Sequence, residues 1–217
     1  TLISLLPFET DYPLRALIAD GYNFNDIADV QTDRFWPYLA ENLAVIDQAL
    51  GLAAPRQGIA LSLDRALIVL TWLPAIPERY LSKLIELGIG DRAPSRSLAQ
   101  SLLADFAGAD RLLRPLVQSP KAEIRARAAA WLAARGDQEA VAVIEAALGK
   151  EKSEVARAAM LTALRRLGGD LGRFMSAEAL DREAKAGLAK AKPGPDWLRF
   201  EVMPPLFWRD GRPVDPD

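Results

Sequence analysis

A short pattern occurs twice in this chain, and its spacing restricts the fold more than any other feature. Residues 123–129 (EIRARAA) reappear in similar form as residues 154–160 (EVARAAM), so the two copies begin 31 residues apart. A glycine–aspartate step follows each copy, at residues 136–137 and 169–170. A fixed period of about 20 to 50 residues is typical of stacked repeats, because one helix pair cannot bury its apolar stripe alone. The sequence therefore predicts a solenoid of stacked helix pairs.

The apolar residues recur at helical spacing from about residue 35 onward, and no stretch alternates in the way that strands do. One apolar stripe covers residues 35–50 before Gly51, and a second lies between Ser62 and Pro74. Later helices are expected after Pro77 and at about 95–107, 110–118, 121–135, 138–148, 152–167 and 176–190. The predicted fold class is all-α, a right-handed α-solenoid of helix hairpins in which Gly136 ends one helix and Asp137 caps the next.

The two copies resemble the short HEAT-type repeat, whose pattern begins Val-Arg and ends Gly-Asp. Residues 124–129 and 136–137 follow that pattern, while the second copy has Ala156 where the repeat has arginine. A partial third copy covers residues 95–110. The resemblance implies HEAT-like hairpins over residues 91–192, preceded by an irregular helical part of the solenoid over residues 1–90.

The C-terminal stretch differs in kind, because residues 192–195 (KPGP) break the helical pattern and aromatic residues then alternate with turn formers. Its Trp-Leu, Pro-Pro-Leu and Asp-Gly steps resemble a segment of large bacterial proteins, the molybdate-metabolism-regulator-like group that often carries WGR domains. In that group the segment follows a HEAT array and precedes another domain. We therefore expect residues 193–217 to be an extended Pro/aromatic tail that leads to a domain outside this sequence. Its candidate partner-binding residues are Trp197, Phe200, Phe207 and Trp208. They would dock on the last helix or on a neighbouring domain, and we favour docking within the chain.

Composition excludes most catalytic chemistry. The 217 residues contain no histidine and no cysteine, which removes the usual zinc, copper and haem ligands, the thiolate nucleophile and the imidazole base. No glycine-rich phosphate loop is present, and the acidic stretch Asp26 to Asp33 lacks the spacing of a calcium loop. A pair of carboxylates could still converge in the fold, although no spacing singles one out. We expect no enzyme activity, no cofactor, no metal, and no catalytic residue.

Charge argues against a nucleic-acid-binding surface as the main function. Lys and Arg number 27 against 29 Asp and Glu, a net charge of −2, so the whole chain does not attract phosphates. Residues 121–192 are locally basic, with 14 basic against 10 acidic side chains. A weaker alternative is an anion-binding ridge, as in DNA glycosylases built from HEAT-like helices, formed by Arg125, Arg127, Arg157, Arg165 and Arg166. Mixed signs on the second helices instead favour arginines paired with glutamates or helix C-termini.

Other features concern location and the tryptophans. The longest apolar run, residues 66–73, is too short to cross a bilayer. The absence of cysteine favours the cytoplasm, and the first residues lack both an initiator Met and a signal-peptide layout. The chain is thus expected to be a segment of a longer protein.

Trp36 and Trp72 are expected in the core, whereas Trp131 is left open.

Together these features predict a non-catalytic protein-interaction scaffold or a structural spacer of a larger bacterial protein. Its partner would be another protein or a neighbouring domain of the same chain, with no membrane contact. The alternatives are a nucleic-acid-binding HEAT-like module and one wall of an enzyme completed by other domains. The oligomeric state is left open.

Overall fold

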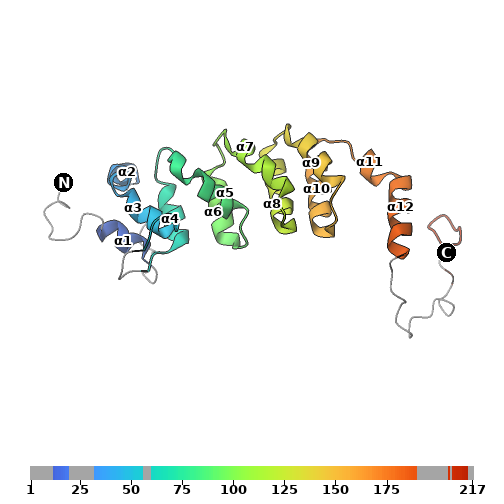
Figure 1. Ribbon diagram of the computed structural model, residues 1–217, viewed down its shortest axis with the longest axis horizontal. Helices are drawn as coiled ribbons and strands as arrows, with labels where there is room; N and C mark the ends of the chain where they lie inside the picture. The colour runs from blue at the N-terminus through green and yellow to red at the C-terminus, as the bar shows by residue number, and fades with distance from the viewer. Residues whose placement is uncertain (1–11, 20–31, 56–59, 190–204, 206, 215–217) are drawn as a thin grey trace, which may run out of the picture. The chain divides into compact units, whose positions relative to one another are not determined.

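The computed structural model describes residues 12–19, 32–55, 60–189, 205 and 207–214, and these ranges are helical apart from turns and two isolated bridges (Figure 1). The predicted all-α class is confirmed for this part of the chain. None of the helices in these ranges combines the length and the apolar character needed to span a bilayer. The chain divides into two compact units, Thr1–Asp170 and Leu171–Asp217.

The first unit begins with α1 (Tyr12–Ile18), α2 (Thr32–Glu41), α3 (Leu43–Ala49) and α4 (Leu63–Leu70). The single stripe expected over residues 35–50 is divided between α2 and α3. The break lies at Asn42, whose side-chain amide donates to the Tyr38 carbonyl at 2.8 Å. A side chain that binds a nearby carbonyl competes with the helical ladder, which explains the break. Gly51 ends α3 with φ of 73°, as its position predicted.

The middle of this unit contains the 3₁₀ turn η3 (Glu78–Tyr80), then α5 (Leu81–Gly88), α6 (Ala93–Leu102), α7 (Ala109–Leu113) and the 3₁₀ segment η4 (Arg114–Gln118). The helix predicted over residues 110–118 is therefore α-helical only in its first half. Pro115 lies at the start of η4, and its missing N–H and its ring disfavour a continuous α-helix there. α6 packs against both α4 and α5.

The repeated sequences form α8 (Ala122–Arg135) and α10 (Glu154–Leu167), which have 14 residues each and pack side by side (Figure 1). Both end at a left-handed glycine, Gly136 with φ of 73° and Gly168 with φ of 77°. The helix between them is α9 (Ala140–Leu148). Buried alanines such as Ala129 and Ala163 allow the close approach of α8 and α10. The two copies are thus equivalent helices in direct contact.

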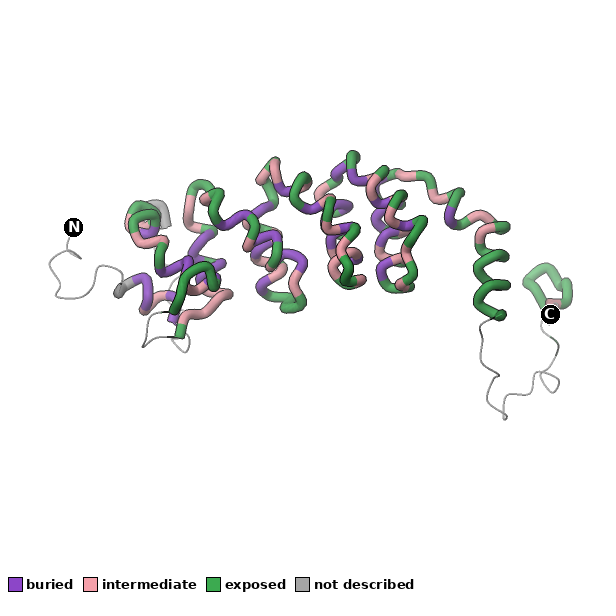
Figure 2. Tube along the Cα trace, viewed as in Figure 1, coloured by how far each residue is buried: buried purple, intermediate pink, exposed green. Residues whose placement is uncertain are grey.

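The second unit contains α11 (Gly172–Met175), α12 (Ala177–Leu188) and a turn over residues 207–213. Ser176 caps α12, because its hydroxyl accepts from the Ala179 N–H at 3.2 Å. None of the α12 residues is buried (Figure 2). The helix predicted over residues 176–190 is therefore present, but its apolar side, with Leu180 and Leu188, is exposed.

The tryptophans depart in part from expectation. Trp36 is 40 % exposed, so its assignment to the core is wrong, and Trp72 is half-buried. The Phe35 ring lies edge-on to Trp72 with centroids 5.7 Å apart. Trp131, which the sequence left open, is 5 % exposed and lies against Gly88 of α5.

Candidate functional site

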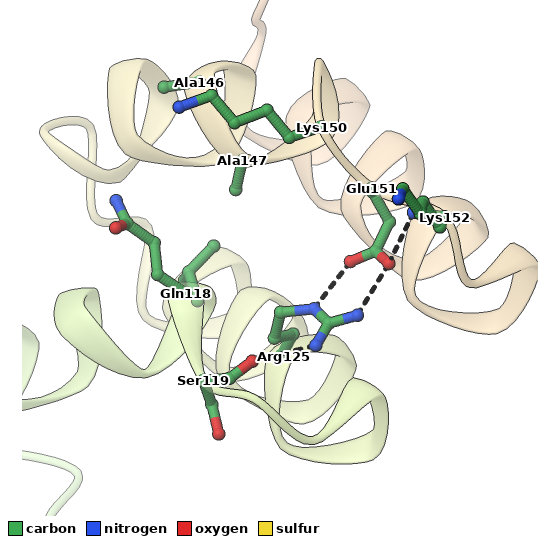
Figure 3. A pocket seen from close by; sticks show the side chains of 9 residues that line it. Gln118, Ser119, Arg125, Ala146, Ala147, Lys150, Glu151 and Lys152 are labelled. Atoms are coloured by element: carbon green, nitrogen blue, oxygen red, sulfur yellow. Dashed lines mark hydrogen bonds and ion pairs between the residues drawn. The ribbon is translucent and has the colours of Figure 1, made fainter.

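Arg125, the first residue of the predicted anion-binding ridge, bridges two loops inside the fold. Its Nε and Nη2 donate to the two carboxylate oxygens of Glu151, each at 2.6 Å (Figure 3). Its Nη1 donates to the carbonyls of Ser119 and Pro120 at 2.8 and 3.0 Å. The Glu151 carboxylate also accepts from the N–H of Ser153 at 2.8 Å and is only 2 % exposed. The hydrogen bonds from Arg125, aided by backbone N–H donors, lower the pKa of Glu151 to about 2. This arginine is therefore engaged within the protein.

Arg127 also binds acceptors of the chain itself, at the C-terminal end of α5. Its Nη1 donates to the carbonyl of Ile89, directly after α5, at 3.0 Å and to the Asp91 carboxylate at 2.6 Å. The hydrogen bond from Arg127 lowers the pKa of the Asp91 carboxyl. A cation at the C-terminal end of a helix is favourably placed against the helix dipole. Arg127 thus joins α8 to α5.

The other three ridge arginines lie on α10. Arg157 is half-buried, whereas Arg165 and Arg166 are exposed in the last turn. Neither Arg165 nor Arg166 forms an ion pair with any residue that the structure describes. Two of the five predicted residues are therefore occupied by internal partners, and two present their charge to solvent.

Two further bridging arginines were not singled out from the sequence. Arg135 donates to the Asp110 carboxylate and to three carbonyls that follow α6, those of Leu103, Ala104 and Phe106, at 2.7 to 2.9 Å. Arg114 donates to both oxygens of Asp137 at 2.7 and 2.8 Å. The N-cap of α9 is Glu139, so the cap predicted at Asp137 is wrong. Asp137 lies in the turn before α9, where it accepts from the Glu139 N–H at 3.2 Å. The sequence did contain one signal for the Arg114 bridge, the Gly-Asp step at residues 136–137, because Arg114 binds the aspartate of that step.

Two surface hollows lie between helix ends of the first unit. The first, of about 360 Å³, lies beside the Arg125–Glu151 pair and is bordered by Lys150 and Lys152 (Figure 3). The second, of about 480 Å³, lies where α4 and α6 end, and we call it the α4–α6 hollow. Its lining is mainly apolar, with Leu70, Leu73, Pro74, Ala75, Ile76, Leu102 and Phe106, together with Thr71, Ser101 and Asp105.

The predicted aromatic residues of the tail are partly described. Phe207 and Trp208 are 61 % and 60 % exposed, whereas Trp197 and Phe200 lie outside the described residues, as does most of the acidic stretch Asp26 to Asp33. Residues 207–213 form a closed turn, which we call the aromatic turn. The Trp208 N–H donates to the Arg212 carbonyl at 2.7 Å, and the Gly211 N–H donates to the Trp208 carbonyl at 2.8 Å. Gly211 has φ of 82°, a conformation that favours glycine.

An ion pair within the aromatic turn uses one of its two arginines. The Arg212 Nε donates to the Asp210 carboxylate at 2.8 Å, and this contact lowers the pKa of that carboxyl. Arg209 is exposed and forms no ion pair with the part of the chain that the structure describes. The turn therefore presents an aromatic pair and one available guanidinium.

Comparisons with known proteins give no relative: no family model, no curated protein and no solved structure matches the chain.

Proposed function

We propose that this chain is a non-catalytic protein-interaction scaffold, built as a right-handed α-solenoid of HEAT-like hairpins. The architecture is supported by α8 and α10, which carry the repeated sequence, have the same length and end at equivalent left-handed glycines. In such arrays each unit contacts only its neighbours, so stability depends on the interfaces between units. Bridges such as Arg125–Glu151, between segments 26 residues apart, supply polar contacts of the kind those interfaces need.

The observation that carries the binding function is the aromatic turn. Phe207 and Trp208 are adjacent, largely exposed and held on a turn whose backbone hydrogen bonds are already made. Tryptophan is enriched among the residues that dominate interface energies, and a preformed conformation reduces the entropy lost on binding. We propose that this turn, as part of the 193–217 tail, anchors a protein partner or a neighbouring domain.

The setting we propose is the cytoplasm of a bacterium, where the chain would be a segment of a larger protein. The lack of cysteine in all 217 residues supports a reducing compartment. The nucleic-acid-binding alternative has less support, since Arg125 and Arg127 already bind carboxylates and carbonyls of the chain itself.

A pull-down from a bacterial lysate in low and high salt tests the binding function. The baits are the unmodified chain, Trp208→Ser, and a matched double variant Arg165→Ser/Arg166→Ser. Because the turn is closed by backbone hydrogen bonds, the Trp208 substitution should leave its conformation intact. We expect one defined protein to be recovered in high salt by the unmodified chain and by the arginine variant, but not by Trp208→Ser.

Two results would argue against the proposal. Nucleic acid retained only in low salt, and lost from the arginine variant, would favour the phosphate-binding alternative. Equal recovery of the same protein by Trp208→Ser would show that the aromatic turn is not the binding site.

A further inference from the structure

The α4–α6 hollow is an apolar depression with an unneutralised acidic residue at its edge. Leu73, Ile76, Leu102 and Phe106 line it and are each only half-buried. Asp105 is exposed and forms no ion pair with the described parts of the chain. Single exposed apolar residues are ordinary, but a lined hollow with a carboxylate at its edge has the form of a small binding site.

The electrostatics of this end of the molecule favour a cation. The hollow lies at the C-terminal ends of α4 and α6, where helix dipoles present partial negative charge. Arg135 already binds the carbonyls of Leu103, Ala104 and Phe106 that follow α6, so the carboxylate of Asp105 is the charged acceptor left at the edge of the hollow. The hollow therefore suits an apolar side chain with a basic group beside it.

The aromatic turn offers that combination on consecutive residues. Trp208 supplies a large apolar ring, and Arg209 supplies a guanidinium without an ion-pair partner among the described residues. Arg212 is not available in the same way, because Asp210 holds it. The hollow belongs to the first unit and the turn to the second, so every copy of the chain carries one of each.

We propose that the aromatic turn of one copy docks in the α4–α6 hollow of a second copy. The Trp208 ring enters among Leu73, Ile76 and Leu102, and Arg209 pairs with Asp105. The inference rests on the proposed function, in that it names the partner of the aromatic turn as a second copy of the chain, in place of the docking within one chain that the sequence favoured. Two different surfaces meet, so the interface is head-to-tail, and its small size makes the association weak and dependent on concentration.

Sedimentation velocity of the purified 217-residue chain over a series of concentrations tests this inference. We expect a reversible rise in the mean sedimentation coefficient with concentration. Trp208→Ser should weaken the association by about 30-fold or more, as for a central aromatic anchor. Arg209→Asp and Asp105→Arg should each weaken it by at least about tenfold, because each places like charges face to face.

Mixing the two charge variants makes the test specific. Each variant alone has like charges at the contact, but the turn of the Arg209→Asp chain can dock in the hollow of the Asp105→Arg chain. We expect an equimolar mixture to regain association that neither variant shows alone, which a contact within one chain cannot produce. Arg182→Asp, an exposed change of the same charge on α12, is the control and should associate like the unmodified chain.

Three results would overturn the inference: a chain that stays monomeric at every concentration, association that survives Trp208→Ser, or a mixture that regains nothing. None of these three results bears on the scaffold proposal, which stands if the pull-down still recovers another protein through Trp208. The scaffold proposal is contradicted only by the pull-down, so the two failures are distinguishable.

Discussion

Replacing Gly88 with alanine tests the packing of α8 on α5. A Cβ at Gly88 would lie 2.5 Å from Cη2 of Trp131 and closer still to Cζ3 of the same ring, whereas carbon atoms in contact are about 3.5 to 4.0 Å apart. The indole ring, buried at 5 % exposure, would have to move by about 1 Å or more. Nothing in the sequence indicates this constraint, because a glycine at a helix end is normally assigned to capping.

Two opposing effects set the change in the free energy of unfolding on Gly88→Ala. Overpacking a buried site costs about 1 to 3 kcal/mol, while alanine is favoured over glycine by at most about 1 kcal/mol inside a helix. Gly88 is the last residue of α5, so the gain lies at the low end of that range. We therefore expect a net loss of about 1 to 2 kcal/mol in the free energy of unfolding.

Urea unfolding followed by circular dichroism measures this loss. With an m-value of about 2 kcal/mol per molar, the midpoint should fall by about 0.5 to 1 M. In a Trp131→Leu background the ring is gone, so the same Gly88→Ala change should leave the midpoint unchanged or raise it. Gly149→Ala is the control, since its Cβ would meet nothing nearer than 3.8 Å. A midpoint unchanged by Gly88→Ala, or lowered equally in both backgrounds, would refute the packing argument.

Three further predictions concern bridges and caps. The pKa of Glu151 is about 2 in the fold against an ordinary 4.5, so the stability that its charged form contributes is complete above pH 4.5 and is lost as the pH falls toward 2. Glu151→Gln should therefore reduce the fall in melting temperature between pH 4.5 and 2. A pH profile of the melting temperature that the substitution leaves unchanged would contradict this prediction. Gly136→Ala should cost about 1 to 2 kcal/mol in urea unfolding, because φ of 73° strains an L residue, while Gly149→Ala should not. Arg135→Met should lower the free energy of unfolding by about 2 to 3 kcal/mol, because Asp110 and three carbonyls lose their donor. Thermal melts measure the loss, and Arg165→Met, a change at an exposed residue, should stay within about 0.5 kcal/mol of the unmodified chain.

The sequence predicted the elements best where a local rule decides them. Gly136 and Gly168 end helices because the left-handed conformation costs glycine nothing, and the end at Gly136 was predicted from the repeat. The breaks that were missed depend on competition between neighbours. Asn42 divides an apolar stripe by binding the Tyr38 carbonyl, and Pro115 turns the second half of a predicted helix into a 3₁₀ segment. In both cases the apolar periodicity continues through the break, so periodicity alone cannot reveal it.

The candidate site was harder to predict, because a charge in the sequence has no stated partner. Arg125 and Arg165 both lie on repeat helices, but within the described ranges only Arg125 meets a carboxylate, Glu151, which is 26 residues away in the chain. Arg135 and Arg114 meet theirs at separations of 25 and 23 residues. Such pairs cancel inside the fold, so a count of charges along the sequence overstates the charge available to a ligand. The charges that stay unpaired in the fold decide what the surface can bind. Among the described residues, Asp105 and Arg209 form no ion pair, carry opposite charges and lie beside apolar side chains.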